Sequence, residues 1–278
     1  MMPVTKKGVR IAVAAVLGLI ILVQFIPSIN YRASLAHGRR YEEESFRDRF
    51  QRVVFGTDAG IKSTAELFSA IYKEDLWRFG DKAPDMPFYS GPGSHDADTV
   101  EPYVNAVRSF LARTFAKPPN VADLGCGDFN IGRQIRNMTN RYTACDIVPE
   151  LIQYNKIAFA QEENVDFRVV DMISQDLPRA DVVLIRQVLQ HLSNEQILSI
   201  VPKLYQYQWA VITEHLPFED DFIPNMDIRT GSVRLGKDSG LELTAAPFRL
   251  QHFGAPVLCE TMAVDGRIRT TAYRLWNT

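Results

Sequence analysis

The chain has 278 residues, a formal net charge of −2 and 46% hydrophobic residues, which is the composition of a globular protein with room for one large domain and an appendage. This near-neutral balance lacks the clustered basic face that nucleic-acid binding requires, so no nucleic-acid partner is expected. The three cysteines are an odd number, which argues against a disulfide framework and for a reducing compartment, and no Cys/His spacing resembles a zinc site.

Residues 11–26 form an almost wholly apolar run, interrupted by Gly18 and Gln24 and flanked on both sides by Lys and Arg. With its neighbours, this run approaches the roughly 20 residues that span a bilayer. We therefore predict an uncleaved transmembrane anchor over residues 1–30 of a single-pass membrane protein. A cleaved signal peptide and a buried helix are the alternatives. Because basic residues flank both sides about equally, the positive-inside rule does not decide the orientation.

Residues 31–89 are predicted to form a helical stem and lid. Within them, residues 41–55 carry apolar side chains at helical spacing, which indicates an amphipathic helix, packed on the domain or, alternatively, on a membrane surface. A capping box that begins at Ser63 predicts a second helix reaching about Trp77. The loop over residues 79–94 is rich in Pro and Gly, and is either a lid over a ligand or a plain connector.

A strand, a tight turn and a helix start are predicted around two closely spaced glycines. Residues 121–124 are an apolar run that includes Asp123, and Gly125 and Gly127 follow. Glycine adopts turn conformations that residues with a Cβ resist, and it lets a ligand approach the backbone. The helix predicted over residues 131–138 would point its free N–H groups at that ligand.

Three more short apolar runs alternate with helical segments, and a polar residue follows each of them. Asp146 ends the second run, Asp171 ends the third, and Arg186 follows the fourth. This alternation predicts a parallel sheet with helices on both faces. Such sheets bind ligands at the carboxyl ends of their strands, and an acid at the tip of the second strand is where a nucleotide ribose presents its hydroxyls.

The C-terminal part is predicted to add a fifth strand over residues 209–213 and a hairpin around Asp265 and Gly266, since Asp-Gly between two extended runs favours a tight turn. Residues 218–239 are interpreted as an inserted loop on the substrate side. The expected fold class is α/β: a doubly wound, Rossmann-like, seven-stranded sheet with an antiparallel C-terminal hairpin, plus an N-terminal membrane helix and a helical N-terminal extension.

This order of motifs resembles that of class I S-adenosylmethionine-dependent methyltransferases. The resemblance covers about residues 90–278 and includes a subset with Ser-Gly-Pro-Gly-Ser at residues 90–94 and Cys-Gly-Asp-Phe-Asn at residues 126–130. It implies a methyltransferase domain over residues 90–278, with S-adenosyl-L-methionine as its cofactor. Since that cofactor is made in the cytosol, a cytosolic domain is expected, with a lumenal orientation as the alternative. Where the family often has a third glycine this chain has Phe129, a bulky residue expected to narrow the loop.

The resemblance also implies cofactor roles for eight residues at the ends of the strands. They are Asp123, Gly125 and Gly127 on the methionine and ribose side, Asp146 for the ribose hydroxyls, Ile147 against the adenine, Asp171 and Met172 at the adenine amino group, and Arg186 near the methyl group. The alternative for each acid is that it caps the helix that follows.

Methyl transfer to a hydroxyl requires a general base, and His191, Glu214 and His215 are candidates near the same edge of the sheet. His191 is alternatively a structural residue at a helix start. The acceptor is expected to be a small molecule, a glycan or a membrane-associated molecule. Two other functions remain open: an NAD-dependent oxidoreductase, which shares the first glycine turn, and a non-catalytic cofactor-binding module.

Overall fold

The computed structural model describes residues 53–54, 56, 63–78 and 86–276. The predicted anchor over residues 1–30 and nearly all of the predicted amphipathic helix lie outside these residues. Among the residues described, no helix combines the length and the apolar character needed to cross a bilayer.

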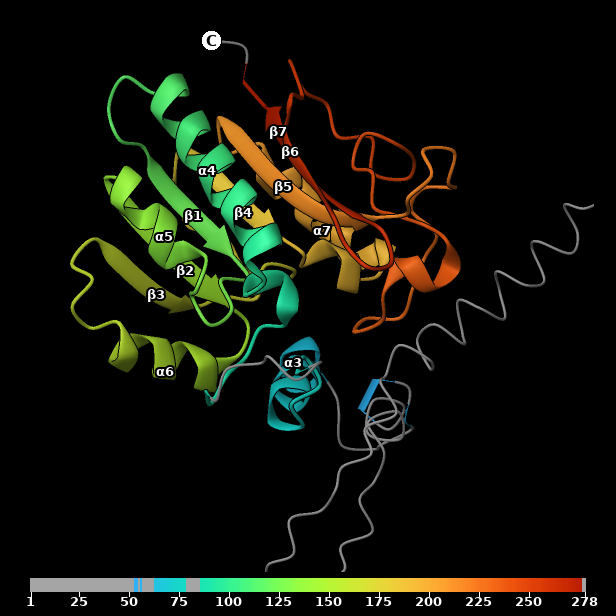
Figure 1. Ribbon diagram of the computed structural model, residues 1–278, viewed down its shortest axis with the longest axis horizontal. Helices are drawn as coiled ribbons and strands as arrows, with labels where there is room; N and C mark the ends of the chain where they lie inside the picture. Colours follow the sequence, from blue (N-terminus) through green and yellow to red (C-terminus); the bar gives the residue numbers. More distant parts are fainter. Residues whose placement is uncertain (1–52, 55, 57–62, 79–85, 277–278) are drawn as a thin grey trace, which may run out of the picture.

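A seven-stranded mixed sheet forms the centre of the molecule (Figure 1), with the strand order β3-β2-β1-β4-β5-β7-β6. The strands β3, β2, β1, β4 and β5 all run parallel to one another, while β7 is antiparallel to both β5 and β6. The strands are β1 Asn120–Leu124, β2 Arg141–Asp146, β3 Val165–Val169, β4 Val182–Arg186, β5 Trp209–Leu216, β6 Val257–Met262 and β7 Arg267–Arg274. The predicted sheet and its C-terminal hairpin are therefore confirmed.

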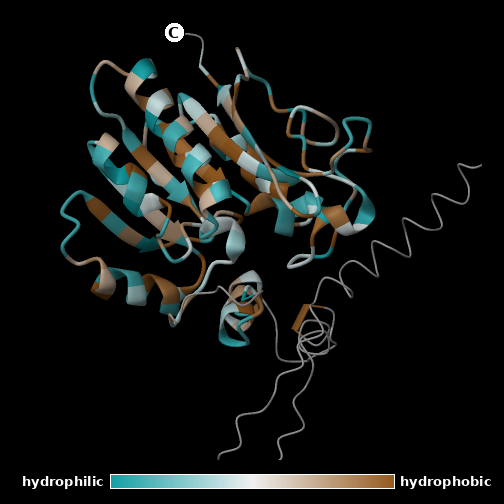
Figure 2. Ribbon diagram, in the orientation of Figure 1, coloured by the Kyte–Doolittle hydropathy of each residue, from teal (hydrophilic) through white to brown (hydrophobic). Residues whose placement is uncertain are grey.

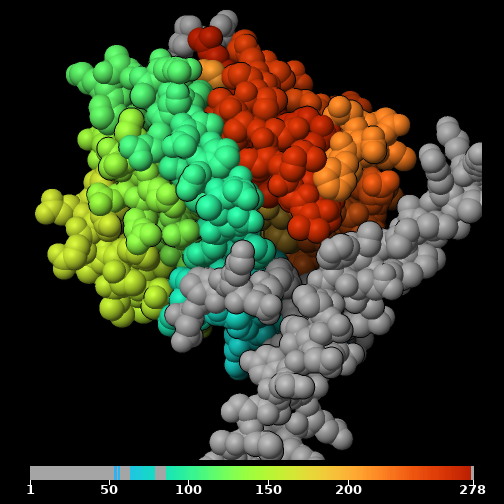
Figure 3. All heavy atoms as spheres, viewed as in Figure 1, coloured from blue at the N-terminus to red at the C-terminus, as the bar shows by residue number. Residues whose placement is uncertain are grey.

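Helices cover both faces of the sheet. The helices are α3 Thr64–Lys73, α4 Ala97–Thr114, α5 Gly132–Ile135, α6 Pro149–Ala158 and α7 Asn194–Leu204. Apolar residues of α4, α5 and α6 share one buried cluster with β1, β2 and β4. Residues of α7 share the other cluster with the opposite faces of β1, β4 and β5. In Figure 3, α4 lies beside the hairpin of β6 and β7 and covers the middle of the visible face.

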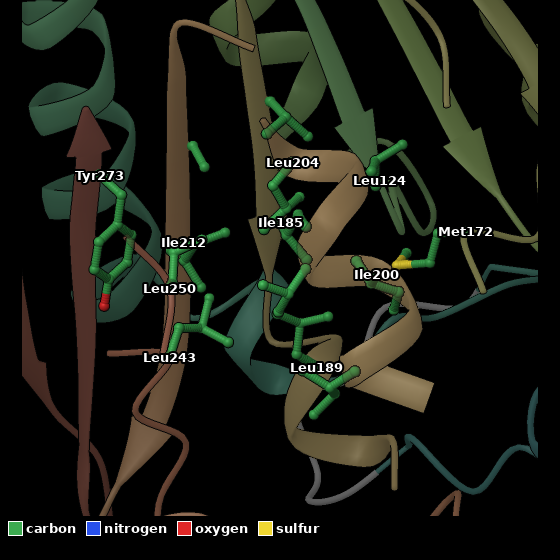
Figure 4. Close-up of a cluster of buried hydrophobic side chains, with 14 of the residues drawn as sticks. Leu124, Met172, Ile185, Leu189, Ile200, Leu204, Ile212, Leu243, Leu250 and Tyr273 are labelled. Carbon is green, nitrogen blue, oxygen red and sulfur yellow. The ribbon is translucent and has the colours of Figure 1, made fainter. Parts of the chain in front are cut away.

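The clusters follow from the strand sequences, which are nearly continuous apolar runs because parallel strands are buried on both faces. Figure 2 shows these strands as the hydrophobic centre and the outer helix faces as polar. Figure 4 shows the α7 side, where Leu124, Ile185 and Ile212 from three strands meet Ile200 and Leu204 of α7. This packing fixes where each strand ends, and therefore where the polar residues after it lie.

Side chains cap three helices at their N-termini, one of them at the predicted Ser63. Ser63 accepts a hydrogen bond from the backbone of α3, Asp96 does the same for α4, and Ser193 forms a full capping box at α7. Each cap satisfies a backbone N–H that has no partner inside its helix. The loop before α4 therefore leads directly onto the edge of the sheet where β1 ends.

Two predicted boundaries were wrong, and one predicted helix differs in type along its length. The helix after Ser63 ends at Lys73 rather than near Trp77, where residues 74–77 form turns. The helix predicted over residues 131–138 is a short α-helix followed by a 3-10 turn. β3 ends at Val169, so Asp171 lies beyond the strand. In each case local periodicity continues past the point where tertiary contacts end the element.

Candidate functional site

The turn between β1 and α5 requires glycine at two positions. Gly125 and Gly127 have φ values of 83° and 54°, which residues with a Cβ rarely adopt. A Cβ at Gly125 would also lie 2.3 Å from a methyl group of Val188. The backbone N–H groups of Gly125 and Cys126 both donate to the carbonyl of Cys145, at 2.8 and 2.9 Å. The turn is therefore held tightly between β2 and the loop after β4.

Asp146, at the end of β2, is bonded directly to this turn. Its carboxylate accepts from the backbone N–H of Gly127 at 3.1 Å and from that of Val148 at 3.1 Å. The side chain is 8% exposed, and burial raises its pKa to about 6 although these backbone N–H groups oppose the shift. The structure thus brings Gly127 and Asp146 together, and Asp146 also holds the backbone of Val148, just before α6, without capping that helix.

Asp123 lies on the face of the sheet that α4 covers. It is 6% exposed and accepts a hydrogen bond of 2.8 Å from the hydroxyl of Tyr142. Burial raises the pKa of Asp123 to about 7, while the Tyr142 hydroxyl and the charge of Arg186 oppose this rise. Asp123 is therefore a buried carboxyl group that favours its protonated form more than an exposed aspartate does, and the charge of Arg186 acts against this preference.

Asp171 and Met172 follow β3 at the same edge. The Asp171 carboxylate accepts from the backbone N–H of Ile173 at 2.9 Å and from the Ser174 hydroxyl at 2.6 Å, so it caps its own turn. Met172 is 9% exposed and belongs to the α7-side cluster. Ile147 is half-buried beside Asp146.

Arg186 ends β4 as a half-buried cation whose closest hydrogen-bond partners are neutral. Its Nη2 donates to the carbonyl of Gly93 at 2.6 Å and its Nη1 to the Gln187 side chain at 2.8 Å. The guanidinium carbon lies 4.9 Å from the centre of the Tyr103 ring. Burial lowers the pKa of Arg186. Among the residues described, no carboxylate lies within ion-pair distance of Arg186, which leaves this cation available to an anionic group.

Phe129 does not narrow the loop, and that prediction was wrong. The ring is fully buried and packs edge-on against Phe167 and Phe159, with ring centres 4.8 and 5.1 Å away. The backbone at Phe129 has a φ of 63°, and the side chain points into the core beneath α5 instead of across the turn. Aromatic packing offsets a backbone conformation that a bulky residue seldom adopts.

Glu214 is the one carboxylic acid among the three candidate bases, and its pKa is strongly raised. It is 4% exposed, neither carboxylate oxygen has a hydrogen-bond partner among the described residues, and burial raises its pKa to about 8. It lines a cavity of about 20 Å³ together with apolar residues of β5 and of residues 241–243, which is room for about one water molecule.

Burial lowers the pKa of both candidate histidines. His191 Nδ1 lies 3.1 Å from the Ser232 carbonyl, so it carries the proton, and its Nε2 lies 3.2 Å from the Gln190 amide nitrogen. Burial lowers the pKa of His191 to about 4. His215 Nε2 lies 3.3 Å from Asp265 at the tip of the hairpin, and burial lowers its pKa despite that carboxylate.

Sequence reasoning missed several residues that the fold brings to this edge. Tyr72 and His95 reach the glycine turn from the N-terminal side. Arg234, only 1% exposed, donates to the carbonyls that close the turn after β4. Arg234 lies within residues 218–239, which were predicted to form an inserted loop on the substrate side, but no role was predicted for it. No periodicity marks these contacts, although the Ser-Gly-Pro-Gly-Ser motif marked the segment that makes them.

Comparison with known proteins finds a similarity to methyltransferase domains. Residues 122–207 match the model of a family described as a methyltransferase domain. Over 158 residues the chain is 27% identical to carboxy-S-adenosyl-L-methionine synthase of Vibrio campbellii, a match that covers 52% of this chain and 61% of that protein. The chain therefore spans less than two thirds of this curated relative.

Two solved structures share the fold. The human N-acetylserotonin methyltransferase in complex with SAM has a TM-score of 0.53 and 17% identity, over 82% of this chain and 67% of that one. The N-methyltransferase NodS of Bradyrhizobium japonicum, in complex with S-adenosyl-L-homocysteine, has a TM-score of 0.53 and 12% identity, over 77% of this chain and 98% of that one.

The sequence match relates residues 122–207 to methyltransferase domains, and the two solved structures share the fold of this chain. They do not favour the nicotinamide-dependent oxidoreductase. The position of β7, antiparallel between β5 and β6, also differs from the six-stranded order of nicotinamide-binding sheets.

Proposed function

We propose that this chain transfers the methyl group of S-adenosylmethionine to a small-molecule, glycan or membrane-associated acceptor. The observation that carries the proposal is the bond between Asp146, at the tip of β2, and the backbone of Gly127, in the turn after β1. It places a carboxylate and a close-approach glycine at one point of the carboxyl edge, where doubly wound sheets bind nucleotides.

The adenosyl half of the cofactor is assigned to Asp146 and its neighbours. The ionised Asp146 carboxylate would accept hydrogen bonds from the two ribose hydroxyls, which are charge-assisted and therefore strong. Ile147 would pack against the adenine, and Asp171 would accept from its amino group beside Met172. The hydrogen bonds that the Asp146 and Asp171 carboxylates already accept leave room for these ligand contacts, because each carboxylate oxygen has two lone pairs.

The methionyl half is assigned to the turn itself, with Asp123 and Arg186 on either side of it. The cofactor brings an ammonium and a carboxylate to this end. Arg186 lacks an ion-pair partner among the described residues, and a carboxylate ligand would neutralise it. Asp123, with a pKa of about 7, would gain a cation that favours its ionised form.

The cofactor supplies an electrophilic methyl group, and the protein supplies position and exclusion of water. Glu214 is the preferred base among the candidates. Its pKa of about 8 lies close to neutral pH, where a base is most effective. His191 has a pKa of about 4 and its Nε2 already faces the Gln190 amide, so it is assigned a structural role, and His215 stays the second candidate.

The proposed domain organisation is an anchor over residues 1–30, a stem and lid over residues 31–89 and a methyltransferase domain over residues 90–278. The catalytic domain is proposed to be cytosolic because its cofactor is made there. An anchor would keep the site near a membrane surface, which favours acceptors that are themselves membrane-bound.

A methyl-label transfer assay tests the proposal. The full-length protein is incubated with methyl-labelled S-adenosylmethionine and, separately, with soluble and membrane fractions of a cell extract. Label is expected in one fraction and not with Asp146→Ala, together with formation of S-adenosylhomocysteine. If the wild type binds the cofactor but forms no S-adenosylhomocysteine with any fraction, the chain is a non-catalytic binding module instead.

A carboxylated S-adenosylmethionine is a second candidate ligand. The curated relative is named for the synthesis of such a compound, and Arg186 is a cation near the expected methyl position without a carboxylate partner among the described residues. Calorimetric titration with both compounds decides between them. Tighter binding of the carboxylated form, lost in Arg186→Met, would favour it. Equal or weaker binding would leave S-adenosylmethionine as the ligand.

A further inference from the structure

The glycine turn is covered by a segment that precedes the matched domain. Helix α3 and residues 86–95 come before residues 122–207 in the chain, yet they lie at the end of the sheet toward which β1 points (Figure 1). In Figure 3 the α3 region emerges at this same end of the molecule. The described part of the predicted lid is thus in contact with the site.

Ser90 and Asp128 join this segment to the turn by two reciprocal hydrogen bonds. The backbone N–H of Asp128 donates to the Ser90 hydroxyl at 2.8 Å, and the backbone N–H of Ser90 donates to the Asp128 carboxylate at 2.8 Å. The same carboxylate oxygen lies 2.7 Å from His95 Nε2. Asp128 is 2% exposed, so these bonds are shielded from water and strong.

Helix α3 is part of the same network through Tyr72, whose hydroxyl lies 2.9 Å from that of Ser90. Both hydroxyls sit directly over the turn. A Cβ at Gly127 would lie 2.4 Å from the Ser90 hydroxyl oxygen and 3.6 Å from that of Tyr72. Glycine is therefore required at position 127 for two reasons: the backbone has a positive φ, and the hydroxyls of Ser90 and Tyr72 lie where a Cβ would be. Burial and the nearby charge of Asp146 raise the pKa of Tyr72, so this hydroxyl keeps its proton and can donate.

Aromatic contacts extend the cover across the edge of the sheet. On one side, the Phe88 ring lies 5.5 Å from that of Tyr154 on α6. On the other side, Trp77 packs on His191 at 5.0 Å in the turn after β4. The Gly93 carbonyl accepts from Arg186 at the end of β4. The cover thus bridges the elements to which the adenosyl and methionyl groups are assigned.

We propose that α3 and residues 86–95 form the roof of the cofactor site, positioned by the Ser90–Asp128 pair, and that the cofactor enters and leaves only when this pair opens. The inference rests on the proposed function. Ser90 and Asp128 are positioning residues, and the Tyr72 hydroxyl is a cofactor-site group contributed from outside the matched domain. Opening admits the ligand, and closing excludes water from the methyl group.

Ligand-exchange kinetics test this proposal. Binding of S-adenosylhomocysteine is followed by stopped-flow tryptophan fluorescence, because Trp77 follows α3 of the roof and packs on His191 in the turn after β4. Ser90→Ala and Asp128→Asn populate the open state, so association and dissociation rates are both expected to rise, by about tenfold, with a smaller change in Kd. Ser90→Thr, which keeps the hydroxyl, is expected to restore near wild-type rates.

Ser69→Ala is the matched control, because this residue is also on α3 but its hydroxyl, among the residues described, donates to exposed Glu150 at 3.5 Å and does not contact the turn. It is expected to leave both rates within twofold of the wild type. A purely structural role for Ser90 would lower thermal stability without changing the rates. Rates unchanged in both Ser90→Ala and Asp128→Asn, or changed equally by Ser69→Ala, overturn the proposal.

Hydrogen exchange of the free protein separates this proposal from the proposed function. Ser90→Ala is expected to raise amide exchange in residues 64–77, 86–95 and 125–130, and Ser69→Ala is not. If the wild type does not bind S-adenosylhomocysteine, the proposed function fails while this exchange pattern still tests the roof. Identical exchange in Ser90→Ala and the wild type refutes the roof, whatever the ligand result.

Discussion

Glu214→Gln is expected to gain stability relative to the wild type as the pH rises from 6 to 9. The carboxyl group is 4% exposed, without a hydrogen-bond partner among the described residues, and burial raises its pKa from 4.5 to about 8 in the folded state. A carboxyl group with a raised folded-state pKa contributes stability below its unfolded pKa, and this contribution is lost as the pH rises through the folded-state value.

The magnitude follows from the two pKa values. Between about pH 6 and pH 9 the unfolded carboxyl stays ionised, whereas the folded one must lose its proton near pH 8. At about 1.4 kcal/mol per pKa unit, the wild type loses roughly 2–3 kcal/mol from this group over that range. Glutamine cannot ionise, so the variant escapes this loss and keeps nearly the same volume.

Urea unfolding followed by circular dichroism at both pH values measures this difference. The control is Glu195→Gln, which changes an exposed carboxyl in the first turn of α7 and is expected to shift stability by the same small amount at each pH. The reasoning is refuted if Glu214→Gln and the wild type lose the same stability between pH 6 and pH 9, since Glu214 would then be ionised without penalty in the fold.

Three further outcomes are expected. Phe129→Ala removes a fully buried ring and is predicted to cost about 3–5 kcal/mol of unfolding free energy in urea denaturation; a cost below about 1 kcal/mol would mean that the ring is not packed. Tyr142→Phe leaves the buried Asp123 carboxyl without its hydroxyl donor and should destabilise by about 1–3 kcal/mol in the same assay, whereas an unchanged midpoint would contradict the bond. Affinity for S-adenosylhomocysteine should be full above the Asp146 pKa of about 6 and should fall by about tenfold per pH unit below it. Titrations from pH 5 to pH 8 measure this, and an affinity that rises toward pH 5 would exclude binding by an ionised Asp146.

The parts of the fold that depend on local patterns were predictable. Continuous apolar runs predicted the buried parallel strands, the two glycines predicted the turn after β1, and Asp265 with Gly266 predicted the final hairpin. Each of these signals is contained within a few neighbouring residues. The predicted alternation also brought Asp146 to the turn at Gly127, because parallel strands end at one edge.

Features that depend on distant contacts were not predictable. Phe129 was expected to narrow the loop because the sequence specifies the size of its ring but not the direction in which the ring points. In the structure a positive φ and three aromatic neighbours direct the ring into the core. The contact of Tyr72 with Ser90, and that of Ser90 with Asp128, join segments 18 and 38 residues apart. No periodicity records such pairs. Capping was the alternative role for each acid, and Asp171 caps its own turn because β3 ends two residues before it.

Calorimetric titration of the full-length protein with S-adenosylhomocysteine tests the central claim, an adenosyl site built on Asp146 and the glycine turn. The wild type is expected to bind one equivalent. Asp146→Ala is expected to weaken binding at least tenfold, which is about 1.4 kcal/mol or more, and Asp176→Ala, which removes an exposed acid after β3, is expected to bind like the wild type. Equal affinity for the wild type and Asp146→Ala, or no binding by any of the three proteins, would contradict the account.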